Sequence, residues 1–162
     1  MRILTGNWIE VKDGDARVRG MYQRHYSAHK YKGDLRIVGP GEHMILMTQD
    51  CLALFAWRKG HDSGYRWHGI DAQIGVNCTI FRNEGDMLSS DLIKEADEMA
   101  WRRWPTEPRH YTYVNADKIK SSHPGYCFLM AGWDYQRDES EKPVKTKGGL
   151  YILEQSLSSG LK

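Results

Sequence analysis

The sequence predicts a single-domain α+β protein with a mixed, mostly antiparallel central sheet flanked by helices. Three observations support this prediction. Two apolar strand-like runs follow each other across a two-residue turn, a later segment carries a clear helical apolar stripe, and short strand-like runs continue as far as residue 153. The chain of 162 residues has the length of one domain, without repeats or a clear linker, so residues 1–162 are treated as one unit.

Composition excludes several classes of protein. A hydrophobic fraction of 40% and a charged fraction of 27% are typical of a folded chain and not of a disordered one. The net charge of +2 does not by itself indicate a nucleic-acid partner. The longest apolar stretch, around residues 51–57, is far shorter than the roughly 20 residues of a membrane span. Three widely spaced cysteines and no signal-peptide pattern lead us to expect a reduced, cytoplasmic protein without a membrane partner.

The first quarter of the chain predicts a strand, a helix and a second short strand. Residues 7–11 form the first strand, and residues 13–15 form a turn. Residues 17–31 are expected to be helical, and residues 35–38 form a strand that ends at a Gly-Pro-Gly turn. The helix is inferred from residues that recur three to four positions apart: Met21, Tyr22, Tyr26 and His29.

The middle of the chain gives the clearest patterns. Residues 44–48 and 51–57 read as a hairpin across Gln49-Asp50, a polar loop covers residues 59–73, and residues 75–82 form another strand. After a turn, residues 90–104 form the best helix, with Ser89 or Ser90 as its N-cap and Pro105 after its end. Its apolar face is made of Leu92, Ile93, Ala96, Met99, Ala100 and Trp104.

The last third predicts a strand, a short helix and two further strands. Residues 110–114 alternate with period two, and residues 124–130 read as a short helix closed by a glycine. Residues 133–136 and 150–153 form the last strands, and the charged segment 137–149 between them is expected to be a mobile loop.

This order, with these residues, resembles the GNAT (Gcn5-related N-acetyltransferase) fold. The likeness is greatest in the C-terminal third, where Asn115 follows a strand and Gly125-Tyr126-Cys127-Phe128 precedes Ala131-Gly132-Trp133. The resemblance implies two parallel strands, residues 79–82 and 111–114, that splay apart around acetyl-CoA. It also implies a set of cofactor-binding residues, namely Arg82, Gly85, Ser89, Ser90 and Asn115.

One segment departs from the family pattern. The usual phosphate-binding loop, Gln/Arg-x-x-Gly-x-Gly/Ala, is replaced at residues 82–89 by Arg-Asn-Glu-Gly-Asp-Met-Leu-Ser, which has one glycine and two acidic residues. Hydroxyls and free N–H groups at the start of the following helix suit a phosphate, while an ordinary N-cap explains one serine equally well. The altered loop supports a non-catalytic GNAT-like binding module as an alternative.

A narrower resemblance concerns the Mom proteins of phage Mu and its relatives, which modify adenine in phage DNA against restriction. It rests on His25-Tyr26-Ser27, Phe55-Ala56-Trp57-Arg58, residues 79–84 and Leu88-Ser89-Ser90. This resemblance implies a DNA substrate, with the adenine amine as acceptor and with Tyr26 and Ser27 on the acceptor side.

The segment 17–34 has the charge pattern that DNA binding requires. Five cationic residues oppose one acidic residue there, and three tyrosines lie between them. Cations neutralise phosphates, and aromatic rings offer a stacking surface for an extruded base, so Arg24 and Lys30 are predicted to contact DNA. The alternative is a solvated helix face whose tyrosines are partly in the core.

Three residues are predicted to move protons. In the GNAT resemblance, Tyr126 is the nearest candidate to protonate the leaving thiolate, although Phe128 holds the more typical position. Asp117 is a candidate base or acceptor-binding group, and His25 is a candidate base because imidazole titrates near neutral pH. All three have a purely structural alternative. His25 and His29 lie one turn apart, but two ligands do not make a metal site, so no metal is predicted.

Taken together, the residues and the resemblances predict a DNA-modifying acyltransferase that uses acetyl-CoA on an adenine amine. The first alternative is an ordinary GNAT acetyltransferase for a small-molecule or pre-modified-base amine. The second alternative is the non-catalytic module.

Overall fold

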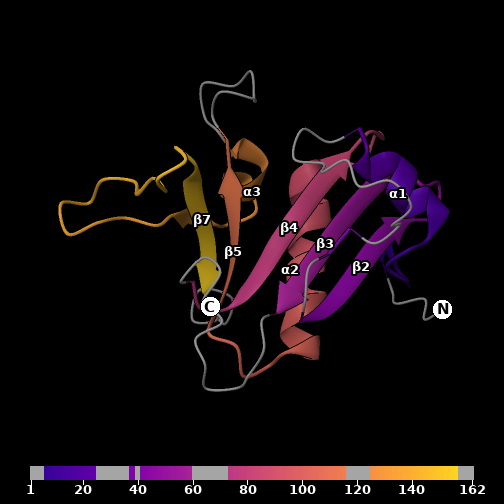
Figure 1. Cartoon of the computed structure of the whole chain (residues 1–162), viewed down its shortest axis with the longest axis horizontal. Coiled ribbons are helices and arrows are strands. Elements are labelled where there is room, and N and C mark those ends of the chain that lie inside the picture. Colours follow the sequence, from indigo (N-terminus) through magenta and orange to yellow (C-terminus); the bar gives the residue numbers. More distant parts are fainter. Residues whose placement is uncertain (1–5, 25–36, 39–40, 60–72, 116–124, 157–162) are drawn as a thin grey trace.

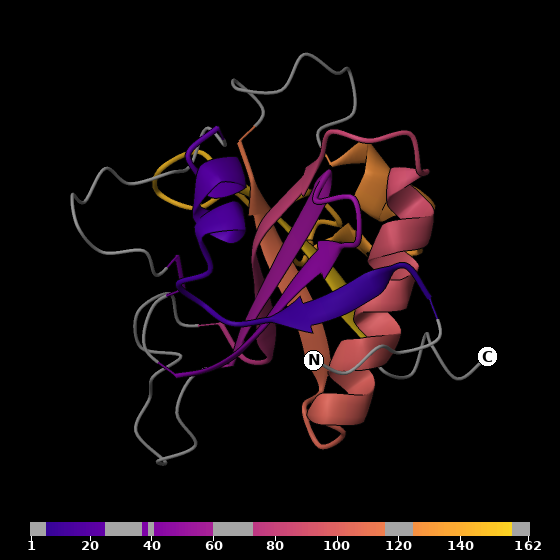
Figure 2. The same cartoon turned by 90° about the vertical axis from the view of Figure 1, so that its right-hand side faces the viewer.

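The computed structural model describes residues 6–24, 37–38, 41–59, 73–115 and 125–156. Its strands and helices, in chain order, are β1 (Trp8–Val11), α1 (Ala16–Tyr22), β2 (Glu42–Thr48), β3 (Ala53–Lys59), β4 (Val76–Asn83), α2 (Ser89–Arg103), β5 (Arg109–Val114), α3 (Tyr126–Met130), β6 (Asp134–Tyr135) and β7 (Tyr151–Ser156). Within the described ranges the strands form one sheet in the order β1-β2-β3-β4-β5-β7-β6. Helix α1 lies on one face of this sheet and α2 runs along the other (Figures 1 and 2). The predicted α+β class and mixed sheet are confirmed.

The sheet consists of two antiparallel parts. Strands β1 to β4 form a meander of neighbours, and β5, β7 and β6 form a second antiparallel group. A single parallel pair, β4 with β5, joins the two parts. The connection from β4 to β5 runs through α2, as parallel neighbours require.

Each face of the sheet has its own hydrophobic cluster. On the α2 face, Phe55, Trp57 and Leu92 are among the fully buried side chains. On the α1 face, Val18, Ile45 and Leu54 are equally buried. The apolar face predicted for the helix at residues 90–104 is confirmed, because all six of its residues are buried.

The predicted helix 17–31 is wrong in its extent. Helix α1 begins at Ala16, after the Asp15 carboxylate accepts the Arg17 N–H, and it ends at Tyr22. In a continuing α-helix the Arg24 backbone N–H would donate to the Gly20 carbonyl. Here it donates to the Met21 carbonyl, and the Arg24 guanidinium donates to the Gly20 carbonyl. Residues 25–31 lie outside the described part of the chain.

The predicted strand 35–38 is also wrong where it is described. The backbone N–H groups of Ile37 and Val38 donate to the two carboxylate oxygens of Asp13, at 2.7 and 3.1 Å, instead of joining the sheet. The hairpin predicted at residues 44–57 is confirmed with a longer turn. Its second strand begins at Ala53, since Cys51 has a left-handed φ of 61° and cannot belong to a strand.

The N-cap predicted for α2 is wrong. Leu88 is the N-cap and provides no side-chain hydrogen bond. The reason is Asn83, whose amide donates to the Met87 carbonyl and to Ser89 Oγ and so draws Ser89 into the first turn.

A buried polar cluster connects α2 with the second part of the sheet. His110 on β5 is fully buried, and its Nδ1 donates to Asp97 Oδ1 on α2 at 2.7 Å. Trp133 Nε1 donates to the other carboxylate oxygen, also at 2.7 Å. The Trp101 ring stacks on the imidazole at 3.5 Å between centroids. Burial lowers the pKa of His110 and so favours the neutral imidazole.

Residues 136–150 project from the end of the sheet (Figure 1). The segment is folded on itself, because the Asp138 carboxylate accepts the N–H groups of Ser140 and Lys142, and Lys145 bridges to Tyr151. The sequence predicted a loop here. No helix among the described residues is long and apolar enough to cross a membrane.

Candidate active site

The parallel pair β4–β5 separates soon after it forms. Residue pairs join the strands only at three positions, Val76–His110, Asn77–Tyr111 and Cys78–Thr112. Both strands then continue without pairing with each other. β4 stays paired with β3 as far as Asn83, and β5 stays paired with β7 as far as Val114. The Thr112 hydroxyl donates to the Cys78 carbonyl at 2.9 Å, at the point where the strands part. The splay predicted between these strands is therefore confirmed.

A β-bulge lies at Thr79, the first residue of β4 that no longer pairs with β5. Ala56 on β3 faces Ile80 and Trp57 faces Cys78, which leaves Thr79 without a partner residue on β3. Cys78 packs in the α2-face cluster, whereas Ile80 packs in the α1-face cluster two residues later. A bulge interrupts the strand pairing and bends the strand locally, and this bulge lies where β4 leaves β5.

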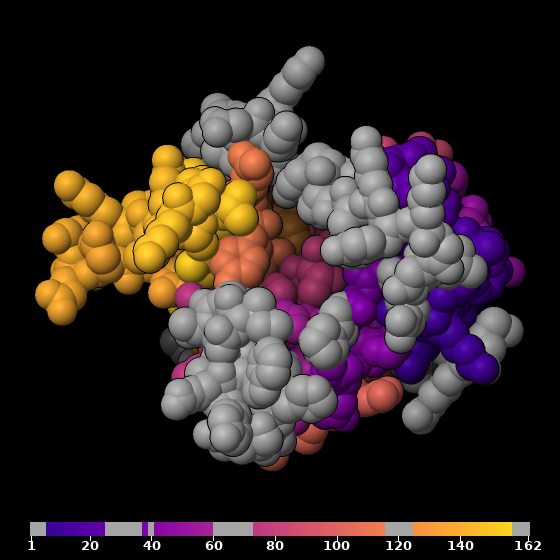
Figure 3. Space-filling view, viewed as in Figure 1, coloured from indigo at the N-terminus to yellow at the C-terminus, as the bar shows by residue number. Residues whose placement is uncertain are grey.

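The splay encloses a cavity of about 500 Å³. Figure 3 shows the surface hollowed between the orange atoms of β5 and the magenta atoms of β4. The cavity is lined by residues of β4 and β5, by the start of α3 and by the residue before β7. These are Asn77 to Phe81, Thr112 to Asn115, Gly125, Cys127, Phe128 and Leu150. Two of these residues are thiols, and burial raises the pKa of both Cys78 and Cys127, which keeps them protonated.

Asn77 is the most unusual polar residue of the cavity. Its side chain is buried, and the amide oxygen has no hydrogen-bond partner among the described residues. A buried amide oxygen without a partner costs about 1–3 kcal/mol. A ligand that donates a hydrogen bond to Asn77 would remove this cost.

The connection from β4 to α2 is held by its own side chains. Asn83 Oδ1 accepts the Gly85 N–H at 3.0 Å, and the Glu84 N–H donates to the Leu52 carbonyl. The Glu84 carboxylate lies between the guanidinium groups of Arg24 and Arg82, which lower its pKa to about 2. The first-turn N–H groups of α2, at Ser89 and Ser90, follow directly.

The structure describes all five residues predicted for the cofactor, and their role stays a prediction. Arg82 is near the end of β4, Gly85 is on the β4–α2 connection, Ser89 and the buried Ser90 are in the first turn of α2, and Asn115 lines the cavity. Gly85 already gives its N–H to Asn83, and Ser89 Oγ already accepts from the same amide.

The residues predicted for catalysis and for the acceptor are less well placed. Tyr126 begins α3 and is 54% exposed, whereas its neighbours Gly125 and Cys127 line the cavity. Its role stays a prediction. Arg24 is described and pairs with Glu84. The other predicted residues lie outside the described part of the chain: His25, Tyr26, Ser27, Lys30 and Asp117.

Sequence reasoning missed three residues of this site. Tyr113 lines the cavity with a phenol, but its position inside an alternating strand gave only a strand signal. Asn77, near the start of an apolar strand, was a weak signal for a polar site. Glu84 was noted as an acid near the phosphate-binding loop, but its partner Arg24 lies 60 residues earlier in the sequence.

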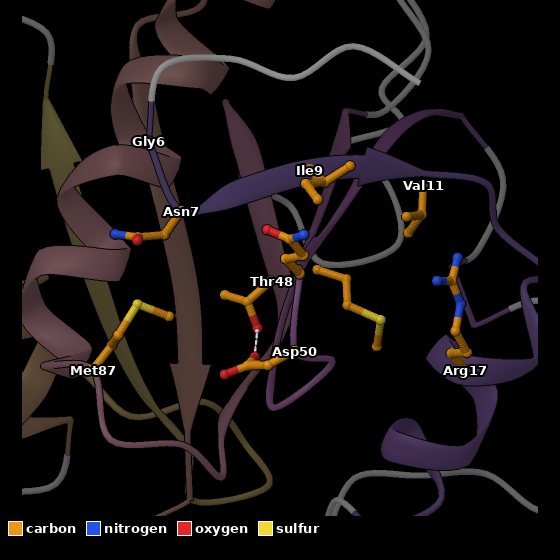
Figure 4. A pocket seen from close by; sticks show the side chains of 10 residues that line it. Gly6, Asn7, Ile9, Val11, Arg17, Thr48, Asp50 and Met87 are labelled. Atoms are coloured by element: carbon orange, nitrogen blue, oxygen red, sulfur yellow. Dashed lines mark hydrogen bonds between the residues drawn. The ribbon is translucent and has the colours of Figure 1, made fainter.

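A second cavity, of about 590 Å³, lies beside the edge strand β1 (Figure 4). Ile9 and Val11 face it from β1, and Asp50 accepts the Thr48 hydroxyl at 2.7 Å inside it. Arg17 at its far end pairs with Asp15. Since its charged groups already have partners, this cavity shows no arrangement for catalysis. Among the described residues, no group of three or more His, Cys, Asp or Glu side chains is placed to hold a metal ion.

Comparison with known proteins identifies the fold. No protein family and no curated protein matches the chain. Two solved structures of the aminoglycoside acetyltransferase AAC(6')-Ib do, one with ribostamycin and coenzyme A and one with paromomycin and acetyl-CoA. Each has a TM-score of 0.51 and 16% identity over 74% of this chain.

These matches cover 66% and 67% of the two acetyltransferase chains, so this chain spans about two thirds of their length. The likeness and the strand order together show that the chain has the GNAT fold, as the broader resemblance predicted. The comparisons give no support to the narrower resemblance to the Mom proteins.

Proposed function

We propose that this protein transfers an acetyl group from acetyl-CoA to an amine of a small molecule. One observation carries the proposal, namely the cavity that opens where the parallel pairing of β4 and β5 stops in a chain of GNAT fold. The solved structures of the same fold support this choice, since they hold coenzyme A or acetyl-CoA together with an aminoglycoside.

The residues present fit such a carrier at both ends. An amide-containing arm needs hydrogen-bond partners, and the Asn77 oxygen, which has none among the described residues, can accept one. At the other end, the free N–H groups of the first turn of α2 and the guanidinium of Arg82 suit phosphate. These groups would hold the two ends of acetyl-CoA.

When bound, acetyl-CoA would supply an electrophilic thioester carbonyl. Transfer forms an N–C bond and breaks a C–S bond, so one proton must leave the amine and one must reach the sulfur. Tyr113 is the phenol that lines the cavity, and we assign it the proton donation. The raised pKa of Cys127 argues against a thiolate nucleophile at this position.

Calorimetric titration with acetyl-CoA tests the proposal, with a variant that fills the cavity and a matched control. Cys127→Trp adds bulk to the cavity lining, whereas Met130→Trp introduces the same side chain on the same helix at a residue that is 53% exposed. We expect wild type and Met130→Trp to bind and Cys127→Trp to lose binding. Absence of binding in the wild type, or equal binding by both variants, would contradict the proposal.

The acceptor is tested with a panel of small-molecule amines, including aminoglycosides, and by mass spectrometry of acetylated products. Modification of adenine in DNA stays a prediction from the sequence. Nucleoside mass spectrometry of DNA from expressing bacteria tests it, and an adenine adduct there without turnover of small amines would favour DNA as the substrate. Binding of acetyl-CoA without any product would favour the non-catalytic module.

A further inference from the structure

Glu84 holds two arginines from different parts of the fold. Arg24, which follows α1, donates from Nε to Glu84 Oε2 and from Nη2 to Oε1, both at 2.8 Å. Arg82, at the end of β4, donates from Nε to Oε2 of the same carboxylate. Glu84 is therefore bound by one guanidinium with two bonds and by a second with one.

The two arginines reach Glu84 from different supports. Arg24 Nη1 also donates to the Gly20 carbonyl at 3.0 Å, which holds this guanidinium against α1. The backbone of Arg82 is paired with Leu54 of β3, and its guanidinium contacts Glu84. The side chains of Arg24, Arg82 and Glu84 are 51%, 30% and 23% exposed, so an anion from solution can reach all three.

Glu84 lies on the connection that leads to the first turn of α2, and both arginines contact it there. Two positive charges and one negative charge give these three side chains a net positive charge, and the negative one is provided by the chain itself. Carboxylate and phosphate oxygens bind a guanidinium with the same planar, two-bonded geometry, so either can occupy Arg24.

We propose that Glu84 is a placeholder anion, and that a phosphate group of the CoA ligand takes Arg24 and Arg82 over from it when the ligand binds. This inference rests on the proposed function and adds to it a residue that sets the affinity. Arg24 becomes a cofactor-binding residue, in place of the DNA contact that the sequence suggested. The β4–α2 connection then differs from the usual phosphate-binding loop in a functional way, because its Glu84 carboxylate competes with the ligand for the two arginines.

If Glu84 competes with the ligand, removing its negative charge should improve phosphate binding. Glu84→Gln keeps the size of the side chain, and we expect it to bind CoA about fivefold more tightly than wild type, as for one exposed charge pair. Arg24→Ala should bind CoA about fivefold more weakly. Pantetheine lacks phosphate, so neither variant should change its affinity.

Calorimetric titrations with CoA and with pantetheine at low ionic strength provide the test. The matched control is Glu154→Gln, which breaks another arginine–glutamate pair, to Arg109, away from this connection. It should leave CoA affinity unchanged. Adding salt should reduce the difference between Glu84→Gln and wild type, because exposed charges are screened.

The outcomes separate this inference from the proposed function. If wild type does not bind CoA, the proposed function fails and this inference fails with it. If wild type binds CoA but Glu84→Gln binds it equally or more weakly, only the placeholder is refuted. Should Glu84→Gln not fold, Arg24→Ala decides, and an unchanged affinity for CoA in that variant would overturn the inference.

Discussion

At the scale of single residues, Asp97 shows how one carboxylate can hold three elements. It accepts hydrogen bonds from His110 on β5 and from Trp133, which lies between α3 and β6, while its backbone belongs to α2. Both donors are buried, so neither has water as a substitute partner. The cluster therefore depends on this carboxylate.

We expect Asp97→Ala to lower the free energy of unfolding by about 3 kcal/mol, because two buried donors lose their acceptor. Urea unfolding measures this loss. Glu98→Ala is the control, since Glu98 is the exposed neighbour on the same helix and should change stability little. Equal stabilities of the two variants would show that the cluster is not needed for folding.

Tyr113 and Tyr126 give a second prediction at this scale. If Tyr113 donates the proton, Tyr113→Phe should lower kcat by about 100-fold while leaving acetyl-CoA affinity unchanged. Tyr126→Phe should have a much smaller effect, because Tyr126 is exposed and does not line the cavity. Steady-state kinetics and calorimetry of both variants decide, and the opposite order would restore the role that the sequence assigned to Tyr126.

Glu84 predicts the pH dependence of stability in acid. Its pKa is lowered from 4.5 to about 2, first by Arg24 and then by Arg82. The unfolded chain therefore binds more protons between these values, and the stabilisation present above pH 4.5 is lost as the pH falls toward 2. After allowance for solvent screening we expect a loss of about 1 kcal/mol. In urea titrations from pH 5 to 2.5, Glu84→Gln should lose less stability than wild type, and parallel curves would contradict this assignment.

At the scale of elements, the entry to α3 depends on a glycine. Gly125 has a φ of 77°, and an added Cβ would meet Leu153 Cδ1 at 2.3 Å. We expect Gly125→Ala to cost about 2 kcal/mol or more, from the left-handed backbone and the clash together. Gly148→Ala is the control, because its Cβ meets nothing closer than 3.8 Å. Thermal unfolding compares the two variants, and equal midpoints would refute the argument.

Elements were predictable where periodicity and burial agree. Helix α2 has an apolar stripe that packs entirely into the core, so its pattern was sufficient. The segment at Ile37 has the apolar character of a strand, yet Asp13 takes its N–H groups. Helix α1 ends early because the Arg24 side chain takes a helix carbonyl. The contact of Asp13 with Ile37 joins residues 24 positions apart, which no local sequence pattern relates.

At the scale of the whole molecule, the order of strands and helices predicted the mixed sheet, and the resemblance to the GNAT fold predicted the splay. The residues predicted for the cofactor lie near the end of β4, on the β4–α2 connection, in the first turn of α2 and after β5, and their role stays a prediction. Tyr113, Asn77 and the pairing of Arg24 with Glu84 were not predictable. Their importance arises only when β4, β5 and α1 are brought together in space.

The three parallel residue pairs between β4 and β5 have a mechanical consequence. Fewer residue pairs join β4 to β5 than join β3 to β4 or β5 to β7, so we expect the two antiparallel parts to separate more easily here than at those neighbouring strand pairs. Helix α2 is bonded to the first part through the indoles of Trp8 and Trp57 and to the second through Asp97. Because α2 connects both parts, we expect a substitution at one of these contacts to change how far β4 and β5 separate.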